Sequence, residues 1–545
     1  MSAAGGHLQE LGRPRRLHLV GIGGAGMSGI ATILATMGHT VTGSDRRDSP
    51  TVQRLRGHGI TVAVGHDATL VAAAELVGAS SAVPPSNPEL VEARRLGIPV
   101  LWRVELLAAL CGLRRTLAVA GTKGKSTTTA MVAHILEVAG ERPSFLVGGD
   151  LPGVDGGARW VGDSPWFVVE ADESDGTFLA LPTEAVVVTN VEADHLDQYG
   201  SMAALREAFT TFARGASGPR IVGADSPDAL VVARELEAAG EAGGGGADGG
   251  GADRGGTGGG TYGDARGGGA PDEDAEETGV PASFRVACAL AARARHDHRG
   301  APDASRRAGP PVVTFGTAPG ADIGATVVAT TRTGVTFELR PGPLVPGAGR
   351  GERWRVELPV PGLHNVRNAC GALALATLVG IPLEVGVAAL ASYRPVGRRF
   401  EWRGERAGTG FVDDYAHVPS AVATTLATAR AGGWERVVAV FQPHLYSRTE
   451  ALGAELGRAL AAADVVVVTD VYAAREAPRP GVDGRLVADA ARAARPALEV
   501  HYVPERAALA TAVRSLLRPG DLCLTLGAGD VTTLADEIQA AEVPR

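Results

Sequence analysis

The sequence is poor in several features that would point to particular classes of protein. Only 4 of its 545 residues are cysteines, and none forms a CxxC pair or a metal-binding spacing, which favours reduced thiols in a cytoplasmic protein. No stretch reaches about 18 uninterrupted apolar residues, so we expect no membrane insertion. The first residues lack the apolar core of a signal peptide. A net charge of −9 provides no basic field for a nucleic acid.

Glycine, by contrast, is abundant, and its most informative use lies in LAVAGTKGKSTTTA, residues 117–130. An apolar strand here runs into Gly121 and Gly124, and then into Lys125, Ser126 and a helix-compatible run. Such a turn aims backbone N–H groups inward and forms an anion cradle at a helix N-terminus. Lys125 would reach the outer phosphates of a nucleoside triphosphate, and the Ser126 hydroxyl is placed to hold Mg²⁺. An ordinary glycine turn before a helix is the alternative.

A second glycine turn lies near the beginning of the chain, in RLHLVGIGGAGMSGIATILATMGHTVTGSD. The pattern predicts a strand, a turn, a helix and a second strand. Gly21, Gly23 and Gly26 fit GxGxxG, and Asp45 ends the second strand about 20 residues further on. These residues predict a nucleotide-type ligand without specifying NAD, and a purely structural turn is the alternative. Alternating segments up to Gly112 predict a parallel sheet covered by helices.

Two apolar strands beyond the first helix-compatible run each end in acidic residues. The first strand is followed by Glu170, Asp172, Glu173 and Asp175, and the second by Glu192, Asp194, His195 and Asp197. The carboxyl ends of parallel strands face the ligand crevice of such a sheet, and Mg²⁺ bound beside a triphosphate needs additional oxygen ligands. We therefore expect both groups near the phosphate site; a solvated acidic loop is the alternative.

Polar residues in two later segments also qualify as ligand contacts. Asn365 and Asn368 lie three residues apart at the start of an expected amphipathic helix, where capping the helix and reading an adenine edge both remain open. In the last part of the chain, polar residues follow two successive strands: Asp413, Asp414, Tyr415 and His417 after one, and His444, Tyr446 and Arg448 after the next. Several strand ends that converge favour ligand contact over purely structural roles.

The length predicts roughly three domains in an α/β fold. We divide the chain into a flexible tail at 1–15, a Rossmann-like domain at 16–112, a central P-loop ATPase domain with a mixed sheet at 113–397, and a Rossmann-like C-terminal domain at 398–545. The central domain contains an antiparallel hairpin before its last helix. It also contains a glycine-rich insertion at about 235–308, which is too poor in apolar residues to fold and holds at most a short helix from Pro281.

Ten motifs, in this order, resemble those of the Mur ligases of peptidoglycan synthesis: GIGGAGMSGIA, GTKGKSTTTAM, EADESDGTFL, TNVEADHLDQYG, PGLHNVRNA, RRFE, DDYAH, FQPHLYSRT, DVYAAREAP and LGAGD. The likeness covers nearly the whole chain except the tail and the insertion. It is strongest to the branch that joins L-alanine to UDP-N-acetylmuramate. It implies that ATP phosphorylates the lactyl carboxylate of the sugar, that the amine of L-alanine attacks the acyl phosphate, and that ATP and Mg²⁺ are required.

The resemblance also implies roles for individual residues. The catalytic residues would be Lys125, Glu170, His195, His417 and Arg448, with Tyr415 beside the last two at the acyl phosphate and alanine. The Mg²⁺ ligands would be Ser126, Glu170 and His195. The ATP contacts would be Gly121, Thr122, Lys123, Gly124, Lys125, Ser126, Thr127, Asn365, Asn368, Arg399 and Asp414. The UDP-sugar contacts would be Gly21, Gly23, Gly24, Gly26, Ser44 and Asp45.

Four positions depart from the family pattern. Lys123 stands where the family has histidine, Ser126 where it has threonine, Val418 where it has histidine, and Leu445 where it has arginine. Serine keeps the hydroxyl that binds metal, whereas Leu445 removes a possible fork for carboxylate or phosphate. Sibling ligases carry a modified lysine soon after the HxD motif; residues 196–218 contain no lysine, which favours the alanine-adding branch.

Other functions remain open at this level. A recycling ligase that attaches a ready-made tripeptide to the same UDP-sugar would carry nearly the same motifs. A catalytically weakened nucleotide-binding relative is compatible with the departures at Val418 and Leu445. A nicotinamide dehydrogenase is disfavoured, because it would leave the second nucleotide site unused. UDP-N-acetylmuramate and L-alanine are the expected partners, and the chain could act as a monomer or a homodimer.

Overall fold

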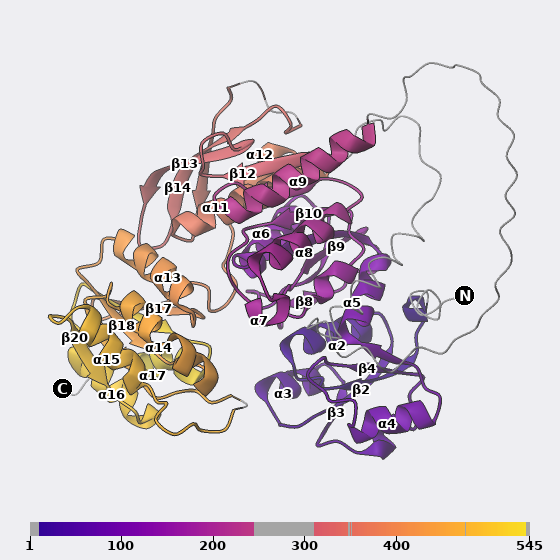
Figure 1. Cartoon of the computed structure of the whole chain (residues 1–545), viewed down its shortest axis with the longest axis horizontal. Helices are drawn as coiled ribbons and strands as arrows, with labels where there is room; N and C mark the ends of the chain where they lie inside the picture. The colour runs from indigo at the N-terminus through magenta and orange to yellow at the C-terminus, as the bar shows by residue number, and fades with distance from the viewer. Residues whose placement is uncertain (1–9, 245–309, 347–348, 350, 475, 541–545) are drawn as a thin grey trace, which may run out of the picture.

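The computed structural model describes residues 10–244, 310–346, 349, 351–474 and 476–540. These residues form an α/β protein with three separate sheets, and each sheet is built from consecutive parts of the chain. Figure 1 shows the three parts in chain order, from the indigo first part through the magenta central part to the orange and yellow last part. Among the described helices, none combines the length and the apolar character needed to cross a membrane.

The first sheet is fully parallel, with strand order β3-β2-β1-β4-β5. Its strands are β1 (Arg16–Val20), β2 (Thr40–Asp45), β3 (Thr61–Val64), β4 (Leu76–Ala79) and β5 (Val100–Trp102). Its helices are α2 (Ala25–Thr36), α3 (Pro50–Gly57), α4 (Pro88–Arg95) and α5 (Arg103–Gly112). The predicted parallel sheet with helical cover is confirmed, and the glycine turn falls between the middle strand β1 and α2.

The central sheet has ten strands in the order β15-β14-β13-β12-β11-β10-β6-β9-β7-β8. The strands are β6 (Arg115–Ala120), β7 (Ser144–Leu146), β8 (Ala158–Arg159), β9 (Trp166–Glu170), β10 (Ala185–Val188), β11 (Arg220–Gly223), β12 (Val312–Gly316), β13 (Ile323–Thr330), β14 (Val335–Pro341) and β15 (Trp354–Leu358). Neighbours are parallel from β7 to β13, and the pairs β13·β14, β14·β15 and β7·β8 are antiparallel. The predicted mixed sheet and hairpin are confirmed.

The helices of the central part include two corrections to the sequence analysis. They are α6 (Lys125–Val138), α7 (Leu196–Tyr199), α8 (Met202–Arg214), α9 (Pro227–Gly244), α11 (Leu363–Leu378) and α12 (Leu383–Leu390). The insertion was expected from about residue 235, but α9 continues to Gly244, because Leu236 is buried and the Thr210 hydroxyl of α8 donates to Glu235 at 2.7 Å. Residues 245–308, including the short helix expected from Pro281, lie outside the described residues.

Helix α11 is the second correction. It begins at Leu363, before Asn365, and it is buried on nearly all sides, whereas the sequence predicted an amphipathic helix. The reason is its position between α6 on one side and strands β11, β12 and β13 on the other, so that both faces meet apolar partners.

The third sheet has six strands in the order β16-β17-β21-β18-β19-β20. The strands are β16 (Glu401–Arg406), β17 (Thr409–Asp414), β18 (Arg436–Phe441), β19 (Val465–Val468), β20 (Glu499–Tyr502) and β21 (Asp521–Leu526). The helices are α13 (Pro419–Ala431), α14 (Tyr446–Leu460), α15 (Arg485–Ala494), α16 (Arg506–Leu516) and α17 (Leu534–Ala540). Only the edge strand β16 is antiparallel to its neighbour. Short 3-10 helices are η1 (Glu10–Gly12), η2 (Ala68–Val71), η3 (Thr177–Ala180) and η4 (Asp530–Thr533).

Candidate active site

The predicted phosphate loop joins strand β6 to helix α6 in the middle of the central sheet. Gly124 occupies the N-cap of α6 with a φ of +84°, and no side chain caps the first N–H groups of the helix. A Cβ atom on Gly124 would lie 2.4 Å from Asn368 Oδ1, and one on Gly121 would lie 2.1 Å from Thr189 Oγ1. Both positions therefore require glycine. The uncapped helix start and the tight turn together fit a bound phosphate chain.

Lys125, the first residue of α6, faces a carboxylate that the sequence analysis mentioned without assigning it a role. Its Nζ lies 2.7 and 2.9 Å from the two carboxylate oxygens of Glu173, whose side chain is 1% exposed. Burial alone would lower the pKa of Lys125, but Glu173, Asp172 and Glu170 outweigh burial and hold this pKa above its usual range. Lys125 therefore stays charged, held by Glu173 at the place where phosphate is expected.

Strand β9 adjoins β6 on one side and delivers the predicted metal carboxylate. The Ser126 hydroxyl donates to Glu170 Oε1 at 3.1 Å, and the Gly148 N–H donates to Glu170 Oε2 at 2.7 Å. A hydroxyl and a carboxylate next to a phosphate cradle are oxygen donors that suit Mg²⁺. The structure thus brings together two of the three predicted metal ligands.

His195, the third predicted ligand, follows β10 on the other side of β6. It has a φ of +53°, and its Nε2 lies 3.9 Å from Asp194 Oδ1. Among the residues that the structure describes, no hydrogen bond joins His195 to Ser126 or Glu170. Within the described ranges, no group of three or more His, Cys, Asp or Glu side chains is arranged to hold a metal ion. The fit to Mg²⁺ therefore rests on the hydroxyl and carboxylate pair.

The end of β10 also holds the phosphate loop from outside, which the sequence did not indicate. Asn190 accepts a hydrogen bond from the Lys123 N–H at 3.0 Å and donates one to the Lys123 carbonyl at 2.8 Å. The Thr189 hydroxyl donates to the same carbonyl at 2.6 Å. The Lys123 ammonium forms an ion pair with Glu192, and the Glu192 N–H donates to the Thr122 hydroxyl at 2.9 Å. Lys123 and Thr122 therefore tie the loop to β10.

The remaining predicted loop residue, Thr127, is buried in the first turn of α6. The predicted adenine contacts lie beside the loop on α11. Asn365 donates to the Pro361 carbonyl at 2.8 Å, and Asn368 donates to Asn365 Oδ1 at 3.3 Å. The N-cap of α11 is Gly362, so neither asparagine caps the helix.

The glycine turn of the first sheet is held by hydrogen bonds to the end of β2. The N–H groups of Gly21 and Ile22 donate to the Ser44 carbonyl at 2.9 and 3.1 Å, and the Gly23 N–H donates to Asp45 Oδ2 at 2.9 Å. The start of α2 at Gly24 has no side-chain cap, which leaves it open to an anion. The Ser44 side chain is fully buried, so it supports the turn without being exposed to a ligand.

Arg103 joins this turn to the central part, and the sequence analysis missed it. A Cβ on Gly26 would lie 3.2 Å from an Arg103 guanidinium nitrogen, and the same guanidinium donates to Asp175 at 2.9 Å and to Thr177 at 3.4 Å. Asp175 lies two residues beyond Glu173, the partner of Lys125. Arg103 therefore links the two places where the sequence predicts nucleotide sites.

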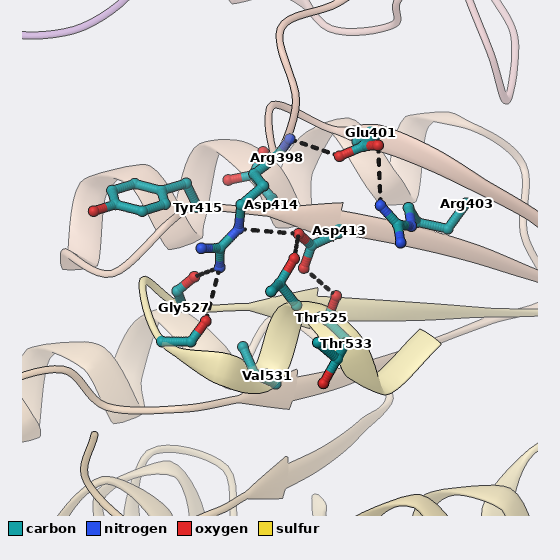
Figure 2. A network of polar contacts seen from close by, with 12 residues as sticks. Arg398, Glu401, Arg403, Asp413, Asp414, Tyr415, Thr525, Gly527, Val531 and Thr533 are labelled. Carbon is teal, nitrogen blue, oxygen red and sulfur yellow. Dashed lines mark hydrogen bonds and ion pairs between the residues drawn. The ribbon is translucent and has the colours of Figure 1, made fainter. Parts of the chain in front are cut away.

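The last sheet is fixed to its incoming linker by a polar network around Arg398 (Figure 2). The Arg398 N–H donates to Glu401, and its guanidinium donates to Asp413 at 3.2 Å and to the Gly527 carbonyl at 2.5 Å. The Thr525 hydroxyl donates to the fully buried Asp413 at 2.6 Å. This network orients the strand end that carries the predicted catalytic residues, and it was not foreseen from the sequence.

Arg399 and Asp414 were predicted to contact the nucleotide. Both carboxylate oxygens of Asp414 accept backbone N–H groups, from Phe400 and from Ala416, each at 2.8 Å. Burial raises the pKa of Asp414, although Arg399 opposes this shift. The guanidinium of Arg399 lies 5.3 Å from the Tyr415 ring centre. Asp414 thus shapes the loop, and Arg399 is the more available of the two.

His417 and Arg448 meet at the carboxyl ends of β17 and β18. His417 Nδ1 lies 2.9 Å from the Tyr415 carbonyl, so it carries the proton and Nε2 holds the lone pair. Burial lowers the pKa of His417 to about 4, and Arg448 and His444 add to this effect. Arg448 donates to His444 Nδ1 at 3.1 Å, and the His444 ring stacks on Tyr472. The cluster offers a neutral base beside a cation.

Three sheets, a phosphate loop on the central one and a glycine turn on the first define a multidomain α/β nucleotide-binding protein. Family models match successive parts of the chain: the Mur ligase family catalytic domain at 16–115, the Mur ligase middle domain at 119–241 and the Mur ligase glutamate ligase domain at 398–529. Together with full-length relatives, these matches show that the chain belongs to the Mur ligase family, and the resemblance inferred from the motifs is confirmed.

The chain is 40% identical over 528 residues to the UDP-N-acetylmuramate--L-alanine ligase of Rubrobacter xylanophilus, which covers 96% of this chain and 99% of that protein. It is 42% identical over 540 residues to the protein of the same name from Kineococcus radiotolerans, covering 98% of each. Among solved structures, the UDP-N-acetylmuramate-alanine ligase of Thermotoga maritima matches with a TM-score of 0.69 at 26% identity, over 96% of this chain and 98% of that one. A murein peptide ligase from Psychrobacter arcticus shares the fold, with a TM-score of 0.60 at 20% identity, over 96% of this chain and 98% of that one.

Proposed function

We propose that this protein is an ATP-dependent ligase that joins L-alanine to the carboxylate of UDP-N-acetylmuramate, giving the amide, ADP and phosphate. The observation that carries this proposal is the identity of 40% and 42% along 96% and 98% of the chain to ligases of that name. A likeness of this extent includes all three sheets, which supports assigning the two substrates and ATP to them.

The phosphate loop suits the activation of a carboxylate. A carboxylate is a poor electrophile, and phosphorylation gives it a leaving group; the protein contributes mainly positioning and charge neutralisation. Lys125 would exchange Glu173 for the transferred phosphoryl group, and the start of α6 would hold the phosphate chain. Ser126 and Glu170 would hold Mg²⁺, which when bound offsets the charge of the phosphates.

The cluster on the last sheet suits the second half of the reaction. The ammonium of L-alanine must lose a proton before its nitrogen can attack the acyl carbon and displace phosphate. His417 is neutral with Nε2 unprotonated, and because its low pKa makes it a weak base, we assign it the role of accepting a hydrogen bond from the deprotonated amine and so orienting that nitrogen. Arg448 provides a cation for the carboxylate of alanine or for the departing phosphate.

The proposal extends to the domain division and the place of the reaction. We assign residues 16–112 to UDP-sugar binding, 113–397 to ATP binding and 398–545 to the amino acid. Each assignment is supported by the site that the corresponding sheet carries. We expect the reaction in the cytoplasm, since both proposed nucleotide substrates are metabolites that cells keep there.

The test is to incubate the full-length protein with ATP, Mg²⁺ and UDP-N-acetylmuramate against a panel of amino acids and the tripeptide. Products are identified by mass, and phosphate release is measured in parallel. We expect one product, carrying L-alanine, and phosphate release only when both substrates are present. A tripeptide adduct would assign the protein to recycling instead, and phosphate release that is independent of the UDP-sugar would contradict ligase activity.

A further inference from the structure

A pocket between the first and central sheet units lies outside all of the sites described above. It has a volume of about 320 Å³, and its lining includes Arg13, Met37, Leu113, Arg114 and Trp160. These residues come from the approach to β1, the end of α2, the link between α5 and β6, and the segment after β8. Helix α2 packs against both α5 and β8, so the pocket lies at the junction of the two units (Figure 1).

The pocket lies at the opposite ends of the strands from the predicted nucleotide sites. Arg114 immediately precedes β6, whereas the phosphate loop follows β6. Strand β6 has 6 residues, so about 20 Å of strand separates the pocket from that loop. In the first sheet, Arg13 precedes β1, and the glycine turn follows β1. A ligand in this pocket would therefore not overlap with the proposed substrates.

The charged groups of the pocket are cationic, and none of the described residues that line it is acidic. Arg114 donates from Nη2 to the Gly162 carbonyl at 2.6 Å, while its Nε is buried without a hydrogen-bond partner. Within the described part of the chain, neither Arg114 nor the exposed Arg13 forms an ion pair. The next residue, Arg115, differs, because its guanidinium donates to Glu184 at 2.7 Å. Unused donors and an uncompensated charge favour the binding of an anion beside Arg114.

The other side chains of the pocket are mainly apolar. The guanidinium carbon of Arg114 lies 4.9 Å from the ring centre of Trp160, which is buried. Met37 and Leu113 are partly buried and pack against the apolar core that the two units share. A second pocket of about 660 Å³ shares Leu113 and Arg114 with the first and adds Leu181. Small organic ligands bind in cavities of about 300–1,000 Å³, so there is room for an apolar body next to the cation.

We propose that this pocket binds a small organic anion with an apolar body, of the class of aryl and alkyl carboxylates. The carboxylate pairs with the guanidinium of Arg114, and Arg13 adds a second cation at the edge of the pocket. The apolar body packs against Met37, Leu113 and Trp160. The site is independent of the proposed ligase reaction, because it lies away from the phosphate loop and the glycine turn.

The test compares three probes that share an indole body and differ in one group: indoleacetate has a carboxylate, tryptophol a hydroxyl and tryptamine an ammonium. Their dissociation constants for the full-length protein are measured by ligand-observed NMR titration. We expect indoleacetate to bind at least about 10-fold more tightly than tryptophol, and tryptamine to bind more weakly than both. Saturating ADP and UDP should leave the affinity for indoleacetate unchanged. Equal binding of the three probes, no binding of indoleacetate, or its displacement by either nucleotide would overturn the inference.

Variants locate the binding in this pocket. Arg114→Met keeps an apolar stem and removes the charge, so it should weaken indoleacetate about 10-fold and change tryptophol by no more than about 2-fold. The matched control is Arg353→Met, which removes an exposed arginine paired with Glu338 and should leave both affinities unchanged. Arg13→Met changes an exposed side chain that folding does not require, and it should weaken indoleacetate about 3-fold. If Arg114→Met does not fold, Arg13→Met decides, and an unchanged affinity for indoleacetate in either folded variant contradicts the proposed site.

Discussion

Lys125 has a different partner in this structure from the one its proposed role requires. Its ammonium is held by the buried Glu173, so binding of a phosphate chain must replace one anionic partner by another. We expect Lys125→Ala to lower ligase turnover by about 1000-fold, since the charge at the transferred phosphoryl group is lost, and to leave UDP binding unchanged. Coupled phosphate release and calorimetry measure the two effects.

The neighbouring lysine supplies the control for that substitution. Lys123 is already paired with Glu192, so Lys123→Ala should change turnover by no more than about 5-fold. A double variant, Lys125→Ala with Glu173→Gln, removes the unpaired carboxylate that the single variant would bury. If the double variant folds as the wild type does and still turns over at a near-normal rate, the proposed role of Lys125 is wrong.

The lowered pKa of His417 predicts that the folded protein loses stability in acid. Its pKa is lowered to about 4 in the folded protein, against about 6.5 in the unfolded chain. As the pH falls below 6.5, His417 becomes protonated in the unfolded chain but stays neutral in the folded protein. The free energy of unfolding therefore decreases between pH 6.5 and 4, by about 2 kcal/mol at pH 5. Urea unfolding at neutral pH and at pH 5 should show a smaller acid loss for His417→Gln. An equal loss in both proteins would contradict the shift.

At the scale of elements, the start of α14 is strained. Leu445 forms its N-cap with a φ of +67°, a region that favours glycine, and it follows His444, the partner of Arg448. We expect Leu445→Gly to raise stability by about 1 kcal/mol, measured by thermal unfolding, because the strain is released. Val418→Gly is the matched control, since Val418 caps α13 at a φ of −122° and glycine there should destabilise. Stabilisation by both changes would exclude strain as the cause.

Deletions before and after the end of α9 should have different effects, although both remove small and polar residues. Removing residues 249–269 leaves the whole of α9 in place, and we expect activity within about 2-fold of the wild type, because the entropy of closing a connection depends only weakly on its length. Removing residues 232–244 deletes the buried Val232 and Leu236 and should lower the melting temperature clearly. Equal melting temperatures would show that α9 does not stabilise the central sheet.

The sequence predicted what depends on local pattern and left out what depends on distant pairing. Gly121 and Gly124 indicated the tight turn between β6 and α6, because the backbone there permits no other residue. Glu173 was expected near the phosphate site but was given no partner, and the supporting contacts of Asn190 and Arg398 were missed, since each side chain pairs with a segment that is distant along the chain. The prediction of an amphipathic helix was wrong for α11, because the burial of both its faces results from packing against α6 and the sheet, which the local sequence does not show.

At the scale of the whole molecule, the first and central sheet units share a buried apolar cluster, and charged side chains add contacts between the units. Arg54 pairs with Asp150 at 3.2 Å between the first and central parts, and Arg103 pairs with Asp175 at 2.9 Å. The guanidinium of Arg332, at the β13·β14 turn, lies 4.1 Å from the Trp434 ring centre beside the last sheet. A reaction that builds an acyl phosphate must exclude water, so the relative placement of these parts matters to the rate.

The contact through Arg103 should matter most, because it is the one that meets both nucleotide-type sites. Its side chain is 19% exposed and that of Asp175 is 24% exposed, whereas Asp150, the partner of Arg54, is 66% exposed. We expect Arg103→Ala to raise the KM for UDP-N-acetylmuramate about 10-fold while the KM for ATP changes little, since a partly buried charged hydrogen bond is lost beside Gly26. Arg54→Ala should stay within about 2-fold of the wild type, as exposed ion pairs contribute little. Equal effects of the two variants on the KM for the UDP-sugar would mean that Arg103 holds the domains together without acting on the substrate site.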